Sequence, residues 1–308
     1  MAAIRFTRRL ALGHAAGAVP AGYLAAASAQ SPAAGSSPSR VIDVATHFYD
    51  TRRPQGVPWP SPEQPILYRP SLPARYLQAA KPHRVHGVVA IEASPWLEDN
   101  LWLLTVADRE PLVKAVVGNI QPGHPDFRPA VERFAKHPLF RGIRVGGGAL
   151  AGMLSDARKA EDLAFLADKG LSLDVLVNAA ANFESVAALA ARLPSLPVIA
   201  GHLPLDDATG MAALAGHPSV VVKVSGVVRK VEGKVPTDAN FYKPGLDHLW
   251  RAFGPKRVLF ASNWPTCDMI APYPTVYGIV AEYLSKRDPA DREAFFWQNA
   301  VRVYRLKL

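Results

Sequence analysis

Short apolar runs, each followed by a segment with helical periodicity, recur along the chain from residue 41 to residue 260. The runs are continuously apolar rather than alternating, as expected for parallel strands that are buried on both faces of a sheet. There are eight of them: Val41–Val44, Gly87–Ile91, Ala115–Ile120, Gly142–Val145, Leu171–Val177, Val198–Ala200, Val220–Val224 and Val258–Phe260. Eight strand–helix units in series predict an α/β fold of a single domain, a (β/α)8 TIM barrel.

The segments between these runs carry helical patterns with recognisable ends. The clearest patterns cover Phe127–Lys136, Asp156–Lys169, Phe183–Arg192, Gly245–Phe253 and Thr275–Ser285. Ser155-Asp156 is placed to cap one helix, Gly170 to end it, and Asn182 to cap the next. An open doubly wound sheet is the competing arrangement. No Gly-x-Gly-x-x-Gly follows any predicted strand, however, so a dinucleotide site has no support.

Residues 1–29 have the composition of an export signal and are excluded from the predicted fold. Arg8 and Arg9 belong to a basic start without acids, Leu10–Ala26 is weakly apolar, and Ala27-Ser28-Ala29 resembles a cleavage site. The arginine pair resembles a twin-arginine signal, so we expect a periplasmic or secreted protein. A disordered or organelle-targeting leader is the alternative. Residues 30–40 are rich in Ser, Pro and Ala and are predicted to be a linker to a barrel at 41–308.

Charge and cysteine content restrict the partners and cofactors. The formal charge of +9 falls to +6 without the three arginines of residues 1–29, and the other basic residues are scattered. That distribution argues against nucleic acid and favours a small, anionic substrate. The apolar part of the leader is broken by Gly and Pro, so an integral membrane protein is not expected. Cys267 is the only cysteine, which excludes an internal disulfide and a Cys-based zinc site. A homo-oligomer is compatible with the sequence.

Polar residues follow the predicted strands at the point where each one ends. In a parallel barrel these ends converge on one pocket. The candidates are Asp43, His47, Glu92, Ser94, Asn119, Gln121, Arg144, Asn178, His202, Lys223, Ser225 and Asn263. Buried polar groups need partners, so this pattern predicts a polar active site at the carboxyl end of the barrel. The long Pro-rich loop Thr51–Pro73, with Trp59 and Tyr68 and with Tyr76 nearby, is expected to lie over that mouth.

The first and last strands carry a resemblance to a known family. Val41–Asp50 and Arg257–Pro265 resemble the first and last barrel strands of the amidohydrolase-related family, which includes sugar lactonases and pyrone-dicarboxylate lactonases. That family usually ends its first strand with His-x-His and its last with Ser-Asp-Trp-Pro. Here Ala45 replaces the first His and Asn263 replaces the Asp. The resemblance covers about residues 41–308, including the closing segment Phe296–Tyr304, and implies the barrel fold.

The resemblance also suggests roles for individual residues. His47 matches the second His of the family motif and His202 the sixth-strand His, so either could activate water. Arg144 and Lys223 match cationic positions and could bind or polarise an anionic substrate, while Asn263 could donate a hydrogen bond to an oxyanion. Further substrate-binding candidates are Glu92, Ser225 and Trp264. The alternatives are a hydrogen-bonded loop histidine at position 47 and a structural ion pair between Lys223 and an acid such as Glu92.

Ala45 and Asn263 also affect what can be expected of metal binding and of the reaction. A catalytic zinc needs about three protein ligands, and Ala45 and Asn263 remove two of those that the family uses. We therefore expect no cofactor and no tightly bound metal. The leading hypothesis is a metal-independent hydrolase that opens a lactone or a related carboxylate-bearing molecule. The alternatives are a lyase or isomerase, such as a decarboxylase, on the same barrel, or a ligand-binding protein with a degraded site.

Overall fold

A computed structural model describes residues 37–308, and eight parallel strands form one sheet in them. Each strand pairs with its neighbours in sequence, so the spatial order is β1 to β8. The strands are β1 Val41–Thr46, β2 Val85–Ile91, β3 Val113–Gly118, β4 Phe140–Gly146, β5 Ser172–Leu176, β6 Val198–Gly201, β7 Val220–Val224 and β8 Val258–Phe260. A parallel bridge between Thr46 and Trp264 brings the two edge strands together. The predicted (β/α)8 barrel is confirmed.

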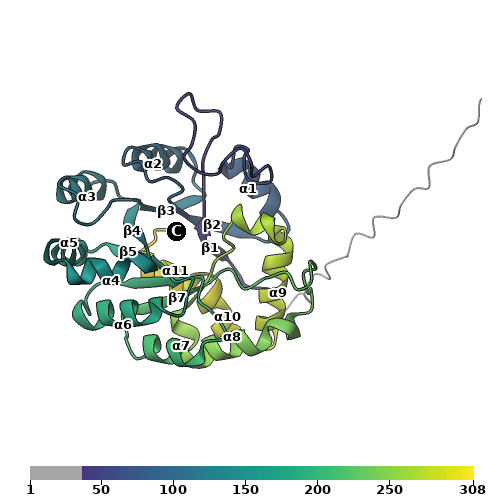
Figure 1. The fold of residues 1–308 in the computed structure, drawn as a ribbon. Helices are drawn as coiled ribbons and strands as arrows, with labels where there is room; N and C mark the ends of the chain where they lie inside the picture. Colours follow the sequence, from purple (N-terminus) through teal and green to yellow (C-terminus); the bar gives the residue numbers. More distant parts are fainter. Residues whose placement is uncertain (1–36) are drawn as a thin grey trace, which may run out of the picture. The chain divides into compact units, whose positions relative to one another are not determined.

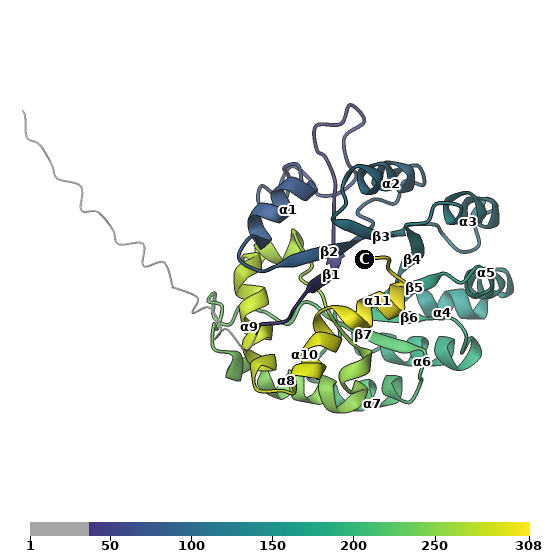
Figure 2. The ribbon, with the colours of Figure 1, turned by 180° about the vertical axis from the view of Figure 1, so that it is seen from behind.

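Helices α1 to α9 surround this barrel, and α10 and α11 lie across it (Figure 1). They are α1 Pro73–Ala80, α2 Asp99–Arg109, α3 Phe127–Ala135, α4 Gly147–Ser155, α5 Ala157–Asp168, α6 Asn182–Arg192, α7 Ala208–Ala215, α8 Ala239–Phe253, α9 Tyr273–Ser285, α10 Pro289–Glu293 and α11 Asn299–Tyr304. Figure 2 shows α10 and α11 crossing one end of the barrel. Asn299 of α11 donates to the carbonyl oxygen of Val258, the first residue of β8, so this is the amino end of the strands.

The predicted helix ends are partly right. Asp156 accepts a hydrogen bond from the backbone N–H of Lys159, and so caps α5 as predicted. Gly170 follows that helix with φ +64°, a conformation that favours glycine. The prediction for Asn182 is wrong by one position: it is the first residue of α6, and the cap position belongs to Ala181. The predicted leader lies outside the described residues. Among residues 37–308, no helix is long and apolar enough to cross a membrane.

Two apolar clusters hold the barrel together. One fills its interior with branched side chains from alternate strand positions, and the larger one packs the outer face of the sheet against the helices. Tyr304 of α11 belongs to the inner cluster and is 1% exposed, so the end of the chain closes the floor of the barrel. A filled interior leaves room for a ligand only at the carboxyl ends of the strands.

Asp43 fastens the first strand to the last. Its carboxylate accepts hydrogen bonds from the backbone N–H of Ser262 at 2.9 Å, the hydroxyl of Ser262 at 2.5 Å and the hydroxyl of Tyr76 at 3.0 Å. Burial raises the pKa of Asp43 to about 6 against these contacts. Asp43 thus faces Tyr76 of α1, and the expectation that it lines the mouth is wrong. Its bonds hold the ends of β1 and β8, which carry His47 and Asn263, beside each other.

Candidate active site

A cavity that encloses about 310 Å³ of empty space, part of it open to solvent, lies at the carboxyl end of the barrel. Its polar lining consists of His47, Arg144, Asp174, His202, Lys223 and Asn263. Five of these six were predicted from the sequence. Asp174 was missed because it lies inside an otherwise apolar run. The cavity wall is completed by apolar strand residues, among them Ala45, Ile91 and Ile199.

His47 is held in a single tautomer. Its Nδ1 lies 3.1 Å from the carbonyl oxygens of both Ile91 and Glu92, so Nδ1 carries the proton and donates. Burial and the charge of Arg144 lower the pKa of His47 to about 3, so the ring is neutral at ordinary pH. Nε2 therefore holds a lone pair at the cavity, which is what a general base requires.

The atom that lies 3.2 Å from Nε2 of His47 is Oδ1 of the Asn263 amide. Because Nε2 and Oδ1 are both acceptors, a hydrogen bond forms here only when the amide is turned by 180° so that its N–H side meets Nε2. Asn263 has φ +62°, a left-handed conformation that asparagine tolerates better than most residues. A carboxylate here would be a base or a metal ligand, whereas the amide supplies a hydrogen-bond donor.

Trp264 does not line the cavity. Its side chain is 0% exposed, and it packs against Phe48 and Tyr76 with the guanidinium of Arg75 over its ring. The prediction that Trp264 contacts substrate is therefore wrong. Asn263 faces the cavity, whereas Trp264, the next residue, fills the core behind it.

Lys223 and Asp174 form a buried ion pair inside the barrel. Nζ of Lys223 lies 2.6 Å from Oδ2 of Asp174, and both side chains are nearly inaccessible. The hydroxyl of Tyr304 donates to the same carboxylate at 3.0 Å from the floor of the barrel. Burial lowers the pKa of Lys223, and the charge of Asp174 opposes that shift. The partner of Lys223 is thus Asp174, and the suggested pair with Glu92 is wrong.

Glu92 pairs with Arg144 instead. Nε of Arg144 lies 2.7 Å from Oε1 of Glu92, and the guanidinium also donates to the Glu92 carbonyl oxygen at 3.2 Å. These contacts fix the end of β4 against the end of β2. Arg144 lines the cavity, while Glu92 stands behind it and borders a second hollow. The two cations of the site are therefore each balanced by one carboxylate.

His202 follows β6 with φ +60°. Its backbone N–H donates to the hydroxyl of Ser225 at 3.1 Å, so Ser225, which is 5% exposed, supports the turn. A Cβ at Gly226 would come within 2.9 Å of the His202 ring, so the glycine leaves the space that the ring occupies. Burial, with the charges of Lys223 and Arg144, lowers the pKa of His202 to about 4. Both imidazoles of the cavity are thus neutral at pH 7.

The loop after β1 reaches the site through one aromatic residue. The Trp59 ring lies edge-on to His47, with centroids 6.2 Å apart, and also contacts Tyr49. Figure 1 shows other parts of this loop projecting outward beside α1 and α2. Tyr76 lies in α1, fully buried, and so takes no part in the mouth. Of the loop's aromatic residues, Trp59 is the one that borders the site.

Comparison with known proteins assigns the chain to a family. The family described as Amidohydrolase matches residues 42–306. The chain belongs to the amidohydrolase family. It is 28% identical to an L-fucono-1,5-lactonase of Burkholderia multivorans, over 86% of this chain and 96% of that one. A crystal structure of an amidohydrolase from the same species with bound zinc has a TM-score of 0.76 and 27% identity, covering 87% of this chain and all of that one.

A more distant structure supports the fold alone. A 2-pyrone-4,6-dicarboxylic acid hydrolase of Pseudomonas putida superposes with a TM-score of 0.66 at 19% identity, covering 87% of this chain and 98% of that one. The shared barrel explains why the site lies at the carboxyl end, since this fold carries its chemistry on the loops there. It does not specify the reaction.

The side chains of the cavity do not fit a tightly bound zinc ion. A catalytic zinc ion takes about three protein ligands, each with a lone pair that is free to bind the metal. The Asp174 carboxylate is occupied by Lys223 and Tyr304, and Ala45 and Asn263 offer no anionic donor. Residues 37–308 hold no group of three or more His, Cys, Asp or Glu side chains that could bind a metal ion.

Proposed function

We propose that this amidohydrolase opens a lactone or a related cyclic ester by attack of water, without a resident metal. The observation that carries the proposal is the neutral His47, whose tautomer is fixed by two carbonyl oxygens and whose Nε2 faces the cavity beside the Asn263 amide. The 28% identity to an L-fucono-1,5-lactonase supports a lactone as the substrate class.

In the first step a water molecule takes the place of the Asn263 amide at Nε2 of His47 and attacks the lactone carbonyl carbon. Its proton passes to Nε2 of His47, and the carbonyl oxygen becomes an oxyanion. Arg144 and Lys223, which both line the cavity, stabilise this negative charge. The oxyanion also offsets the charge of Arg144, which is one cause of the low pKa of His47. The imidazole therefore becomes a stronger base as the charge develops.

In the second step the intermediate collapses. The carbonyl re-forms, the bond from its carbon to the ring oxygen breaks, and the ring oxygen takes the proton from Nε2 of His47. The product is a hydroxy acid, which then ionises. His202 is also neutral and follows β6, whereas His47 follows β1. It would bind a substrate hydroxyl or assist this proton transfer. Both steps need only side chains of the cavity and one water molecule.

Turnover should resist chelation. Purified chain incubated with EDTA and desalted is expected to hydrolyse a panel of sugar lactones at an unchanged rate and to carry far less than one zinc per chain. The reason is that residues 37–308 offer no third free ligand beside His47 and His202. Elemental analysis and a pH-indicator hydrolysis assay measure the two quantities. A zinc ion that is lost together with activity would contradict metal independence, and no hydrolysis of any lactone would contradict the reaction itself.

The pH profile should show an acid limb far below the ordinary histidine range. Catalysis requires the neutral base, and the pKa is about 3 for His47 and about 4 for His202. As pH falls, the rate is lost only when the folded protein takes up these protons. We therefore expect kcat/KM to stay level from pH 8 to about 5 and to decline below about 4. A midpoint near 6.5 would contradict the assigned environment of both rings.

A further inference from the structure

The two ends of the barrel differ in charge. The segments that lead from a helix to the next strand lie at the amino end, together with Arg40 and the closing residues 286–308, whose helices cross that end in Figure 2. They carry thirteen Lys and Arg against four Asp and Glu, a net side-chain charge of +9. The segments that lead from a strand to the next helix lie at the carboxyl end and carry six against ten, a net charge of −4.

We call the surface formed by the first set of segments the amino-end face. Without residues 1–29 the whole chain has a formal charge of +6, so this face carries more positive charge than the rest of the barrel leaves in total. The Lys and Arg residues are scattered along the sequence, but the alternation of strands and helices brings them to one end of the barrel. A charge asymmetry of this kind attracts anionic partners to one side of a protein.

Most cations of the amino-end face have no acid beside them. Lys169 is paired with Glu132 and Arg287 with Asp247. Within residues 37–308, no ion pair includes the exposed residues Arg40, Lys81, Arg84, Lys136, Lys256, Lys286, Arg302, Arg305 and Lys307. These charges are balanced by solvent ions and are available to a partner.

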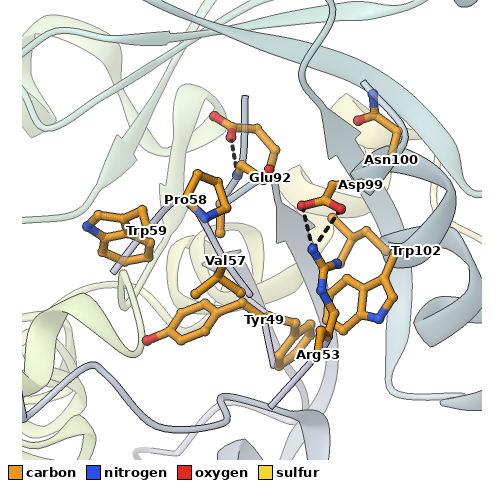
Figure 3. Close-up of a pocket in the computed structure, with 13 residues that line it drawn as sticks. Tyr49, Arg53, Val57, Pro58, Trp59, Glu92, Asp99, Asn100 and Trp102 are labelled. Atoms are coloured by element: carbon orange, nitrogen blue, oxygen red, sulfur yellow. Dashed lines mark hydrogen bonds and ion pairs between the residues drawn. The ribbon is translucent and has the colours of Figure 1, made fainter. Parts of the chain in front are cut away.

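The carboxyl end provides the contrast. Arg53 donates to the carboxylate of Asp99 at 2.9 Å, a pair that Figure 3 shows with its two bonds. Nε of Arg144 lies 2.7 Å from the carboxylate of Glu92. Cations near the active site are thus neutralised by neighbouring acids, whereas those at the opposite end are not.

One group of the unpaired cations surrounds α11. The guanidinium of Arg302 donates to the carbonyl oxygen of Lys256, and that of Arg305 to the carbonyl oxygen of Gly170. Carbonyl oxygens carry no net charge, so both guanidinium charges stay uncompensated. Burial, with the charge of Arg305, lowers the pKa of Arg141 at the start of β4, so these two cations repel each other. An anionic partner would relieve that repulsion.

The kind of anionic partner follows from the apolar side chains on each end. Proteins that bind single-stranded nucleic acid place exposed aromatic rings beside their cations, and bases stack on these rings. The exposed aromatic residues Tyr68, Trp96 and Phe241 follow β1, β2 and β7, and so lie at the carboxyl end. The amino-end face has Leu308 instead, which is 50% exposed and follows α11. Cations around an exposed aliphatic side chain suit the head groups of anionic lipids.

The chain also enters the barrel on this face. The backbone N–H of Ser39 donates to the carboxylate of Glu293 at 2.8 Å, and the guanidinium of Arg40 lies 5.6 Å from the ring centroid of Trp297. The predicted export leader, which lies outside the described residues, precedes Ser39 in the sequence. A membrane that takes up such a leader would be met by the cations of the amino-end face.

We propose that the amino-end face binds the surface of a bilayer that contains anionic phospholipids, while the active site at the opposite end stays accessible to solvent. Each basic residue near such a surface strengthens binding about fivefold, so several unpaired cations together give a firm attachment. Salt screens these charges, so the attachment is sensitive to ionic strength. The proposal concerns a surface far from the cavity and does not rest on the proposed hydrolysis.

The test is co-sedimentation of the full chain with vesicles of phosphatidylcholine, alone or with phosphatidylglycerol in a ratio of about 2:1. We expect binding to the mixed vesicles that is lost when the salt concentration rises from about 0.05 M to about 0.5 M. The double variant Lys256→Glu, Lys307→Glu should weaken this binding by about 30-fold or more. Its matched control is Lys230→Glu, Lys234→Glu, which changes the charge equally in the exposed segment after β7 and should bind like the unmodified chain.

The four lysines make no side-chain hydrogen bond or ion pair within residues 37–308, so both double variants should fold. Both also keep residues 1–36, so any binding by that segment is the same in each. Equal binding to the two kinds of vesicle would overturn the proposal. An equal loss in both variants would show that net charge, and not the amino-end face, attracts the lipid. Displacement from the vesicles by an equal charge of duplex DNA of about 20 base pairs would make nucleic acid the partner instead.

Discussion

Replacing Lys223 with Met should lower the free energy of unfolding by about 3–5 kcal/mol. Asp174 is 2% exposed, and Lys223 is its counter-charge at 2.6 Å. Without that lysine a carboxylate would remain in the barrel interior, where the Tyr304 hydroxyl still donates to it, and a buried unpaired charge is strongly destabilising. Urea denaturation followed by tryptophan fluorescence measures the change.

A paired substitution separates stability from catalysis. The double variant Lys223→Met, Asp174→Leu removes both charges and should recover most of the lost stability, because an apolar pair fills the same space without desolvated ions. Its turnover should stay low, since the cation beside the oxyanion is gone. If Lys223→Met lowered the free energy of unfolding by less than about 1 kcal/mol, Lys223 and Asp174 would not form a charged, buried ion pair.

The second large effect is expected at His47. His47→Gln should reduce kcat/KM by about 10²- to 10⁴-fold while the fold is kept. Glutamine can still donate to the carbonyl oxygens of Ile91 and Glu92, but it has no basic lone pair to take a proton from water. Steady-state kinetics with the best lactone of the panel, together with circular dichroism, measure both quantities.

Two histidine variants make that result specific. His83→Gln removes another partly buried imidazole, whose pKa burial lowers to about 4, but it stacks on Tyr277 outside the active site and should leave turnover unchanged. His202→Asn suits the left-handed backbone and should cost on the order of 10²-fold if His202 shares the proton transfer. Full activity of His47→Gln with loss in His202→Asn would reverse the two assignments.

The barrel could be predicted because its signal is repeated along the whole chain. Continuous apolar runs of strand length, separated by helical patterns, permit few other folds. The ends of single strands were less accurate. Ala115–Ile120 was predicted where β3 runs from Val113 to Gly118, because the pairing of β3 with β2 and β4 decides where a strand begins and ends. That pairing is set by neighbours far away in the sequence.

The active site was predictable where a motif marked it. His47, Arg144, His202, Lys223 and Asn263 all line the cavity. Asp174 was missed, although a carboxylate inside an apolar run implies a buried cation as its partner. That reasoning gives the kind of partner but not its position on β7. Trp264 was misassigned because its motif gives its place in the sequence and not the side to which it points.

The contacts that shape the active site join residues far apart in the chain. Asp43 and Ser262 are separated by 219 positions, and Asp174 and Tyr304 by 130. Loop-closure entropy opposes such pairings until most of the chain is ordered, so they form late in folding. On refolding, helical structure should therefore return before the cavity forms. A barrel in which Tyr304 of α11 has not yet reached Asp174 has its strands and helices but not a complete active site.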